Sequence, residues 1–254
     1  MAFLQIRLLG RPEISHEDQP VSDDLSAKAI ALLAYLLAGP EGGSTRDELS
    51  GLFWGDADEE HANYYLRRTL WALRKALNHQ AAATDTYICF YEGRYFFQTG
   101  SDYWLDLSEF QRVLSPSTRE FPAQPGPPIG FGTPGRERVT LAAGLALYRG
   151  KFLQGLHLRG YAGVMDWIDY CRDKLEKLYV GGLRALALEE ASLPNQGGAI
   201  AAYEQVVALD PLDEDAVSGL MVAYYNAGAR EKALERYRSF QRALRQQLEL
   251  EPLP

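Results

Sequence analysis

Cysteine and histidine are scarce in this sequence of 254 residues, with two and four copies respectively. Cys89 and Cys171 stand far apart without a second pair, so the sequence predicts neither a disulfide framework nor a zinc cluster. No histidine has a cysteine or carboxylate partner at a metal-ligand spacing on one helix face. We therefore expect no metal site and no cofactor.

Long apolar runs are absent as well. No stretch approaches the ~20 apolar residues that cross a bilayer. The first ten residues also lack the basic start and apolar block of a secretion signal. We expect a cytoplasmic protein that does not enter a membrane.

Catalytic signatures are missing too: the sequence has no G-x-S-x-G, no P-loop lysine motif and no H-E-x-x-H. Gly130, Gly132 and Gly135 do satisfy G-x-G-x-x-G. They follow the proline-rich residues 122–129, however, and a dinucleotide-binding fingerprint requires a strand at that point. We interpret residues 115–134 as a Pro/Gly-rich loop, and we expect no enzyme.

The net charge of −8 excludes a protein that coats nucleic acid indiscriminately, because non-specific affinity comes mainly from neutralising phosphates. Residues 61–77, HANYYLRRTLWALRKAL, stand out because they carry four basic residues and no carboxylate. At 100° per residue their apolar side chains form one narrow stripe, made of Ala62, Leu66, Leu70, Leu73 and Leu77. The opposite arc is basic and aromatic, with Asn63, Tyr64, Arg67, Arg68, Trp71, Arg74 and Lys75.

The elements around this amphipathic helix favour DNA binding. A small antiparallel sheet, two helices, the amphipathic helix and a hairpin follow one another, over residues 3–22, 26–38, 44–54, 58–78 and 87–98. The hairpin turns at Glu92-Gly93. This is the order of a winged helix, in which the last helix enters the major groove and the hairpin flanks it. The alternative for the basic face alone is a solvated helix surface.

Each side chain of the amphipathic helix then has an expected role on DNA. The side chains expected to read base edges in the major groove are Asn63, Arg67, Trp71 and Arg74. Flanking phosphates are assigned to Tyr64, Arg68 and Lys75. Arg94, near the tip of the hairpin, is the candidate for the adjacent minor groove.

The second half of the chain is predicted to be helical, over residues 107–114, 135–149, 161–192, 196–209, 213–227 and 229–249. The segment AIAAYE at 199–204 lies 34 residues before ALERYR at 233–238, which is the tetratricopeptide period. We therefore expect an α+β winged helix over residues 1–100. An all-α tetratricopeptide-like domain follows over residues 101–254, and surfaces of that type bind proteins.

Three motifs carry a family resemblance: LQIRLLGRPEI at 4–14, LFWGD at 52–56 and LRRTLWALRKAL at 66–77. They resemble the DNA-binding half of the Streptomyces antibiotic regulatory protein family, whose winged helix is of the OmpR/PhoB type. The rest of the chain resembles the bacterial transcriptional activator domain that follows in that family. The resemblance implies a sequence-specific transcriptional activator that binds double-stranded DNA, forms a homodimer on direct repeats and recruits RNA polymerase.

The turn GDADEE at 55–60 concentrates four carboxylates before the amphipathic helix. The resemblance implies that Asp56 and Asp58 contact a sigma factor or the alpha subunit of the polymerase. Capping of the helix is the alternative explanation for carboxylates at this place.

Two other functions stay open at this point. The helical repeats could form a protein-interaction scaffold, or they could serve as the effector-binding module of a larger signalling protein. An effector groove would be lined by tyrosines, although packing inside the repeats is the favoured explanation for them; they are Tyr203, Tyr224, Tyr225 and Tyr237. Larger relatives in the family carry an ATPase module downstream, so a longer native chain is a further expectation.

Overall fold

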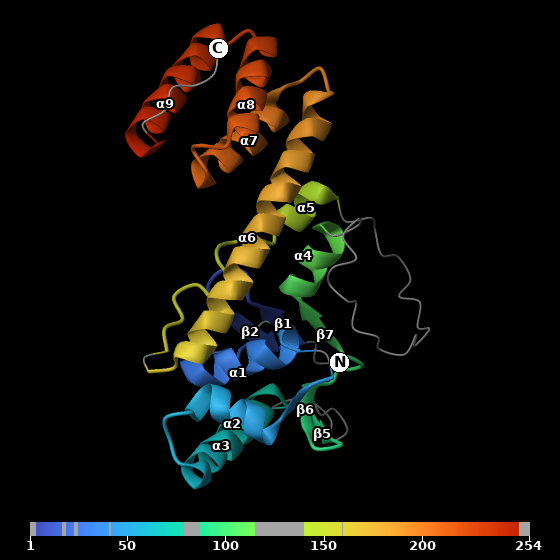
Figure 1. Cartoon of the computed structure of the whole chain (residues 1–254). Helices are drawn as coiled ribbons and strands as arrows, with labels where there is room; N and C mark the ends of the chain where they lie inside the picture. Colours follow the sequence, from blue (N-terminus) through green and yellow to red (C-terminus); the bar gives the residue numbers. More distant parts are fainter. Residues whose placement is uncertain are drawn as a thin grey trace. The chain divides into compact units, whose positions relative to one another are not determined.

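The computed structural model describes residues 4–16, 19–22, 25–40, 42–78, 87–114, 140–158 and 160–248. The chain divides into two compact units (Figure 1). The first unit comprises residues 1–139 and 146–175, and the second comprises residues 140–145 and 176–254. The boundary predicted near residue 100 falls within the first unit. The predicted Pro/Gly-rich loop at 115–134 lies outside the described residues.

The first unit begins with a four-stranded sheet in the order β3-β2-β1-β7. Its strands are β1 (Leu4–Arg7), β2 (Glu13–His16), β3 (Gln19–Pro20) and β7 (Tyr103–Leu105). Strands β1, β2 and β3 pair antiparallel, as the alternation of apolar and polar residues predicts, whereas β7 runs parallel to β1. The sequence analysis missed β7 because three residues are too few to show a period of two.

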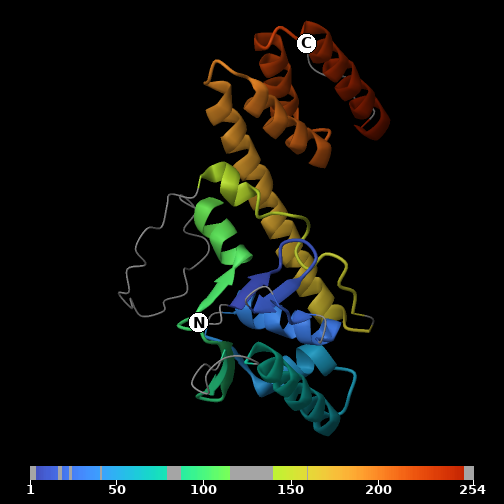
Figure 2. The ribbon, with the colours of Figure 1, turned by 180° about the vertical axis from the view of Figure 1, so that it is seen from behind.

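Three helices and a second sheet complete the winged helix, and the predicted fold class is confirmed. The helices are α1 (Ala27–Ala38), α2 (Arg46–Trp54) and α3 (Glu59–Leu77). The second sheet has the order β4-β6-β5, from β4 (Ser44–Thr45), β5 (Ile88–Tyr91) and β6 (Arg94–Phe97). Seen from behind, the β5–β6 hairpin lies beside α3 (Figure 2). Capping residues set the starts of the helices, since Ser26, Thr45 and Asp58 each accept a hydrogen bond from a backbone N–H of the first turn.

A buried carboxylate joins the sheet to the next helix, α4 (Asp106–Leu114). The Asp106 side chain accepts hydrogen bonds from the backbone N–H groups of Leu8, Leu9 and Leu107 at 2.9, 2.9 and 2.7 Å. Burial raises the pKa of Asp106 above its ordinary value, and the three N–H donors oppose that shift. Asp106 therefore satisfies backbone groups at the end of β1 that have no strand partner.

Residues 146–158 also pack against the end of β1. The N–H of Leu153 donates to the carbonyl oxygen of Leu8 at 2.9 Å, and Leu9 forms a β-bridge with Phe152. The guanidinium of Arg172 donates to the carbonyl oxygens of Phe152 and Leu153 at 2.9 and 3.0 Å. These contacts fasten the segment to the start of α6 (Ala162–Ala191).

The helix predicted over residues 135–149 is therefore wrong in part. Residues 146–149 are not helical, because this segment leads into the residues that bond to the end of β1. Only α5 (Leu141–Leu145), in the second unit, is helical within that span. The start of the predicted helix, residues 135–139, lies outside the described residues.

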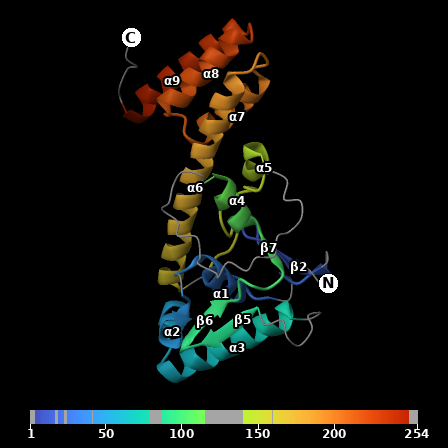
Figure 3. The ribbon, with the colours of Figure 1, turned by 90° about the vertical axis from the view of Figure 1, so that its right-hand side faces the viewer.

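The second unit is helical, which confirms the tetratricopeptide-like class. Helix α8 (Glu214–Asn226) packs between α7 (Gly197–Leu209) and α9 (Arg230–Leu248), as Figure 3 shows. The ring of Tyr203 lies on Gly219, where an added Cβ would come 2.4 Å from the ring. Ala199 and Ala233, which are 34 residues apart, are both buried. The repeat seen in the sequence thus corresponds to equivalent core positions on α7 and α9.

We expect Asp106→Ala to lower the free energy of unfolding by about 2–5 kcal/mol, because two buried N–H groups of β1 lose their acceptor. Urea denaturation followed by circular dichroism measures this change. The exposed Asp102→Ala, four residues earlier, is the matched control and should change stability by less than about 0.5 kcal/mol. Equal stabilities of the two variants would contradict the role given to Asp106.

Candidate nucleic-acid interface

Helix α3 has acidic residues in its first turn and basic residues in its last turn. The Asp58 carboxylate accepts the N–H of His61 at 3.0 Å, and Glu59 and Glu60 occupy the first turn. Arg74 and Lys75 occupy the last turn. Acidic residues at the start of a helix and basic residues at its end both favour the helix dipole. The helix is therefore stable over five turns with its cations toward one end.

The apolar stripe predicted for α3 is confirmed, since its five members are all buried: Ala62, Leu66, Leu70, Leu73 and Leu77. They pack against α2 and α1. Two polar contacts fix the helix further. The Ser50 hydroxyl donates to the Asn63 amide oxygen at 3.1 Å, and the buried His16 ring donates through Nε2 to the carbonyl oxygen of Leu77. Helix α3 is thus attached to α2 near its start and to β2 at its end.

The opposite face of α3 presents cations and aromatic rings to solvent. Tyr64 is 51% exposed and Trp71 is 63% exposed. Arg67, Arg68 and Lys75 are exposed as well. The Lys75 ammonium lies 5.3 Å from the centre of the Trp71 ring, within the range of a cation–π contact. Five of the predicted side chains are therefore brought together on one accessible surface, which we call the α3 face: Tyr64, Arg67, Arg68, Trp71 and Lys75.

Asn63 and Arg74, also predicted to read bases, are half-buried and already bonded. The Asn63 amide oxygen accepts the hydrogen bond from Ser50. The Arg74 Nε donates to the carbonyl oxygen of Ile88 in β5 at 3.1 Å. Arg74 therefore connects α3 to the hairpin, and each of the two side chains keeps N–H donors beyond those contacts.

Arg94, the hairpin residue predicted to reach the minor groove, is partly engaged within the protein. Arg94 folds back, donating through Nη1 to the Gly43 carbonyl oxygen at 3.0 Å and lying 3.7 Å from the Glu48 carboxylate. Arg94 nevertheless stays 46% exposed, and the rings of Phe90 at 50% and Tyr91 at 66% are exposed beside it. The sequence analysis missed these two rings. The available signal was their place beside the turn, where a hairpin extends beyond its core.

The two aspartates in the turn before α3 differ in their contacts. Asp58 caps the helix and pairs with His61, whose Nδ1 lies 2.7 Å from a carboxylate oxygen. The N–H of His61, its ring and its charge lower the pKa of Asp58. Asp56 is exposed in the turn. Capping therefore accounts for Asp58, and both aspartates are exposed in this turn.

The described residues were compared with the requirements of a metal centre and of a reactive thiol. Nowhere in it do three or more His, Cys, Asp or Glu side chains gather closely enough to hold a metal ion. Cys89 and Cys171, the two cysteines of the sequence, are not joined in a disulfide. Burial raises the pKa of the Cys171 thiol to about 11, so this residue is a poor nucleophile at neutral pH.

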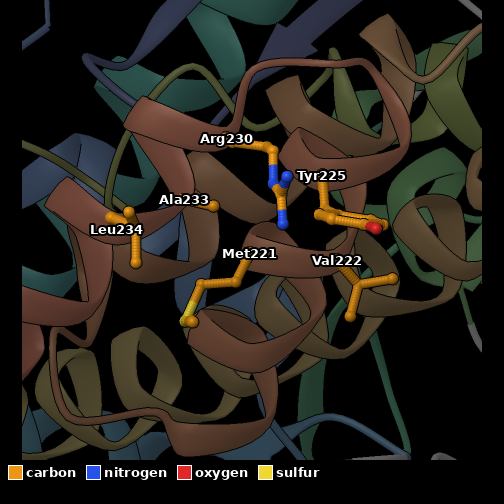
Figure 4. Close-up of a pocket in the computed structure, with 6 residues that line it drawn as sticks. All are labelled: Met221, Val222, Tyr225, Arg230, Ala233 and Leu234. Atoms are coloured by element: carbon orange, nitrogen blue, oxygen red, sulfur yellow. The ribbon is translucent and has the colours of Figure 1, made fainter.

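The tyrosines considered for an effector groove separate into two groups. Tyr203 and Tyr224 are buried inside the second unit and Tyr237 is half-buried, as repeat packing predicts. Tyr225 is exposed and lines an apolar pocket of about 440 Å³ between α8 and α9 (Figure 4). Arg230 lies 5.4 Å from its ring centre and is the charged group of the lining. The other lining residues are Met221, Val222, Ala233 and Leu234.

A comparison with protein families identifies the helical part of the chain. The profile of the bacterial transcriptional activator domain family matches residues 105–254. The chain belongs to this family. Its members are transcriptional regulators rather than enzymes, and the resemblance noted in the sequence is confirmed. No curated protein matches the chain.

A solved structure supports the arrangement of the fold. The chain is similar to Mycobacterium tuberculosis EmbR in complex with a low affinity phosphopeptide, with a TM-score of 0.68 and 20% sequence identity. The alignment covers 100% of this chain and 63% of the EmbR chain, so this chain spans less than two thirds of that protein. At this identity the similarity establishes the fold alone.

Every helix within the described ranges is too short or too polar to span a membrane.

Proposed function

We propose that this member of a transcriptional regulator family binds double-stranded DNA in a sequence-specific manner, with the α3 face in the major groove. The observation that carries the proposal is the segregation of charge on α3. From residue 61 to residue 77 all four charged side chains are basic, while the apolar stripe is buried. An α-helix fits the major groove, where arginine donates to guanine O6 and N7.

The contacts described above refine the role proposed for each side chain. Arg67 and Trp71 are accessible and would contact base edges, while the exposed Tyr64, Arg68 and Lys75 would contact flanking phosphates. The Asn63 oxygen is engaged by Ser50, so Asn63 would donate to an acceptor edge rather than make the two-bond contact with adenine. Arg74 would contact DNA through its terminal nitrogens while Nε holds β5. For the minor-groove contact, we propose Tyr91 in place of Arg94, because Tyr91 is the more exposed side chain.

Activation is the second part of the proposal. The exposed Asp56 would contact the sigma factor or the alpha subunit of RNA polymerase, and the helical second unit would contribute protein contacts. Dimerisation on direct repeats would extend the DNA site beyond the few base pairs that one winged helix reads. Support for these points comes from the family and from the exposed position of Asp56.

A protein-interaction scaffold is the competing function, and the apolar pocket between α8 and α9 favours it (Figure 4). Fluorescence anisotropy with random duplex DNA at low salt separates the two. A regulator with the α3 face exposed should bind such DNA, whereas a scaffold with a net charge of −8 should not.

The first test begins with selection of a binding site from genomic fragments by the purified chain. On that site Arg67→Ala should cost about 1–3 kcal/mol and relax the base preference. Lys75→Ala should weaken all sequences alike and reduce the salt slope by about one. Electrophoretic shifts over a salt series measure both effects.

The exposed Arg11→Ala, in the turn between β1 and β2, serves as the control for loss of one positive charge. Its affinity and salt slope should match those of the unchanged chain. Failure to enrich any sequence would overturn the proposal. Identical behaviour of the Arg67 and Lys75 variants would overturn the division between base and phosphate contacts.

The second test concerns the hairpin. Tyr91→Ala should lower DNA affinity by about three- to tenfold, the effect of roughly 1 kcal/mol of lost contact, with no change in melting temperature. Arg94→Ala should lower the melting temperature, because its hydrogen bond to the Gly43 carbonyl is lost. Tyr91→Phe keeps the ring and separates stacking from hydrogen bonding. If Arg94→Ala alone reduced affinity while Tyr91→Ala had no effect, the original assignment to Arg94 would be correct.

A further inference from the structure

A second cationic helix lies in the other unit. Helix α9, from Arg230 to Leu248, carries six basic residues against two carboxylates, in a chain whose net charge is −8. The DNA-binding proposal makes no use of this helix. A charge of this sign gathered on one element of an acidic protein marks a surface for an anionic partner.

Part of this charge gathers on one side of α9. Lys232, Arg236, Ser239 and Arg242 follow one another at spacings of four, three and three residues, which places them along one helix face. Together with two neighbours they line a cavity of about 240 Å³. We call this set the α9 cavity, and its lining residues are Tyr224, Lys232, Glu235, Arg236, Ser239 and Arg242.

The floor of the α9 cavity is fixed by the buried Tyr224 of α8. Its hydroxyl donates a hydrogen bond to the Glu204 carboxylate of α7, and the Arg236 side chain also interacts with it. The Lys232 ammonium lies 5.8 Å from the Tyr224 ring centre. Three helices of the second unit therefore hold the lining in place, and Arg236, half-buried, is the least mobile of the cations.

In the described parts of the chain, no carboxylate forms a salt bridge with Lys232, Arg236 or Arg242. Glu235 belongs to the lining but lies beyond salt-bridge distance from them. Three convergent cations without a carboxylate partner favour an external one.

We propose that the α9 cavity binds an acidic segment of a partner protein, with Lys232, Arg236 and Arg242 receiving its carboxylates. Charge complementarity supports an anionic partner. The Glu235 carboxylate in the lining favours a polypeptide over a nucleic acid. A phosphodiester chain offers no donor to Glu235 and is repelled by it. A polypeptide presents backbone N–H groups between its acidic side chains, and these can donate to Glu235.

The experiment uses the full chain and a fluorescein-labelled peptide of eight glutamates, followed by fluorescence anisotropy at low salt. Lys232→Glu/Arg242→Glu changes two exposed members of the cavity and should weaken peptide binding by about tenfold or more. Arg230→Glu/Arg245→Glu makes the same change of charge on α9 outside the cavity lining and should weaken peptide binding far less than the cavity variant does.

Three further measurements serve as controls. Circular dichroism checks that both double variants remain folded, and an Arg67→Ala/Lys75→Ala variant checks that the peptide does not bind at the α3 face. Duplex DNA affinity is measured on the same proteins and should be unchanged in the cavity variant. Equal loss of peptide binding in both α9 variants would overturn the proposal. Loss of DNA affinity in the cavity variant alone would identify the surface as a nucleic-acid contact, which would overturn it too.

Discussion

The buried stripe of α3 fixes which of its side chains face solvent, and the candidate interface depends on that constraint. Four leucines and Ala62 occupy the stripe, and burial of each leucine contributes roughly 1.5–3 kcal/mol. A rotation of α3 by one residue, 100°, would expose leucines and bury arginine side chains without partners. No single surface contact with DNA could offset that cost. The α3 face is therefore set by packing before any DNA is present.

Polar contacts from distant parts of the chain determine the finer arrangement. His16 holds the end of α3 through the carbonyl of Leu77, and Ser50 holds Asn63. Arg74 fastens β5 to α3, and Arg94 fastens β6 to Gly43. Two of the arginines expected to contact DNA thus also hold the strands of the hairpin in place. Asp106 has a comparable structural role at the other end of the first unit.

How much could be predicted from the sequence depends on whether a feature is set by neighbouring residues or by distant ones. The stripe, the caps and the Glu92-Gly93 turn were predictable because each depends on residues within a few positions of one another. Strand β7 was not, since three residues carry no periodicity and its pairing with β1 is long-range. The same holds for residues 146–158, whose partners are Leu8 and Gly10. Among the site residues, the helical wheel identified the exposed face of α3 but could not reveal that Asn63 and Arg74 are engaged elsewhere. The position of Arg94 near the hairpin turn likewise gave no sign of its bond to Gly43.

Two helices of this acidic chain carry concentrated positive charge, and their surroundings differ. On α3 the cations alternate with exposed aromatic rings on an open face, which suits a groove lined by bases and phosphates. On α9 three cations converge on a cavity that also contains Glu235. Within a family of transcriptional regulators, these differences support one polyanionic and one polypeptide partner.

The most direct measurement of the central claim is base-analogue interference on the selected DNA site. Replacing each guanine in turn by 7-deazaguanine removes an acceptor from the major groove, and replacing it by inosine removes the minor-groove amino group. The account predicts that 7-deazaguanine lowers affinity at one or more positions, and that Arg67→Ala abolishes the effect at one of them. Affinity that responds to inosine alone, or to neither analogue, would contradict the placement of α3 in the major groove.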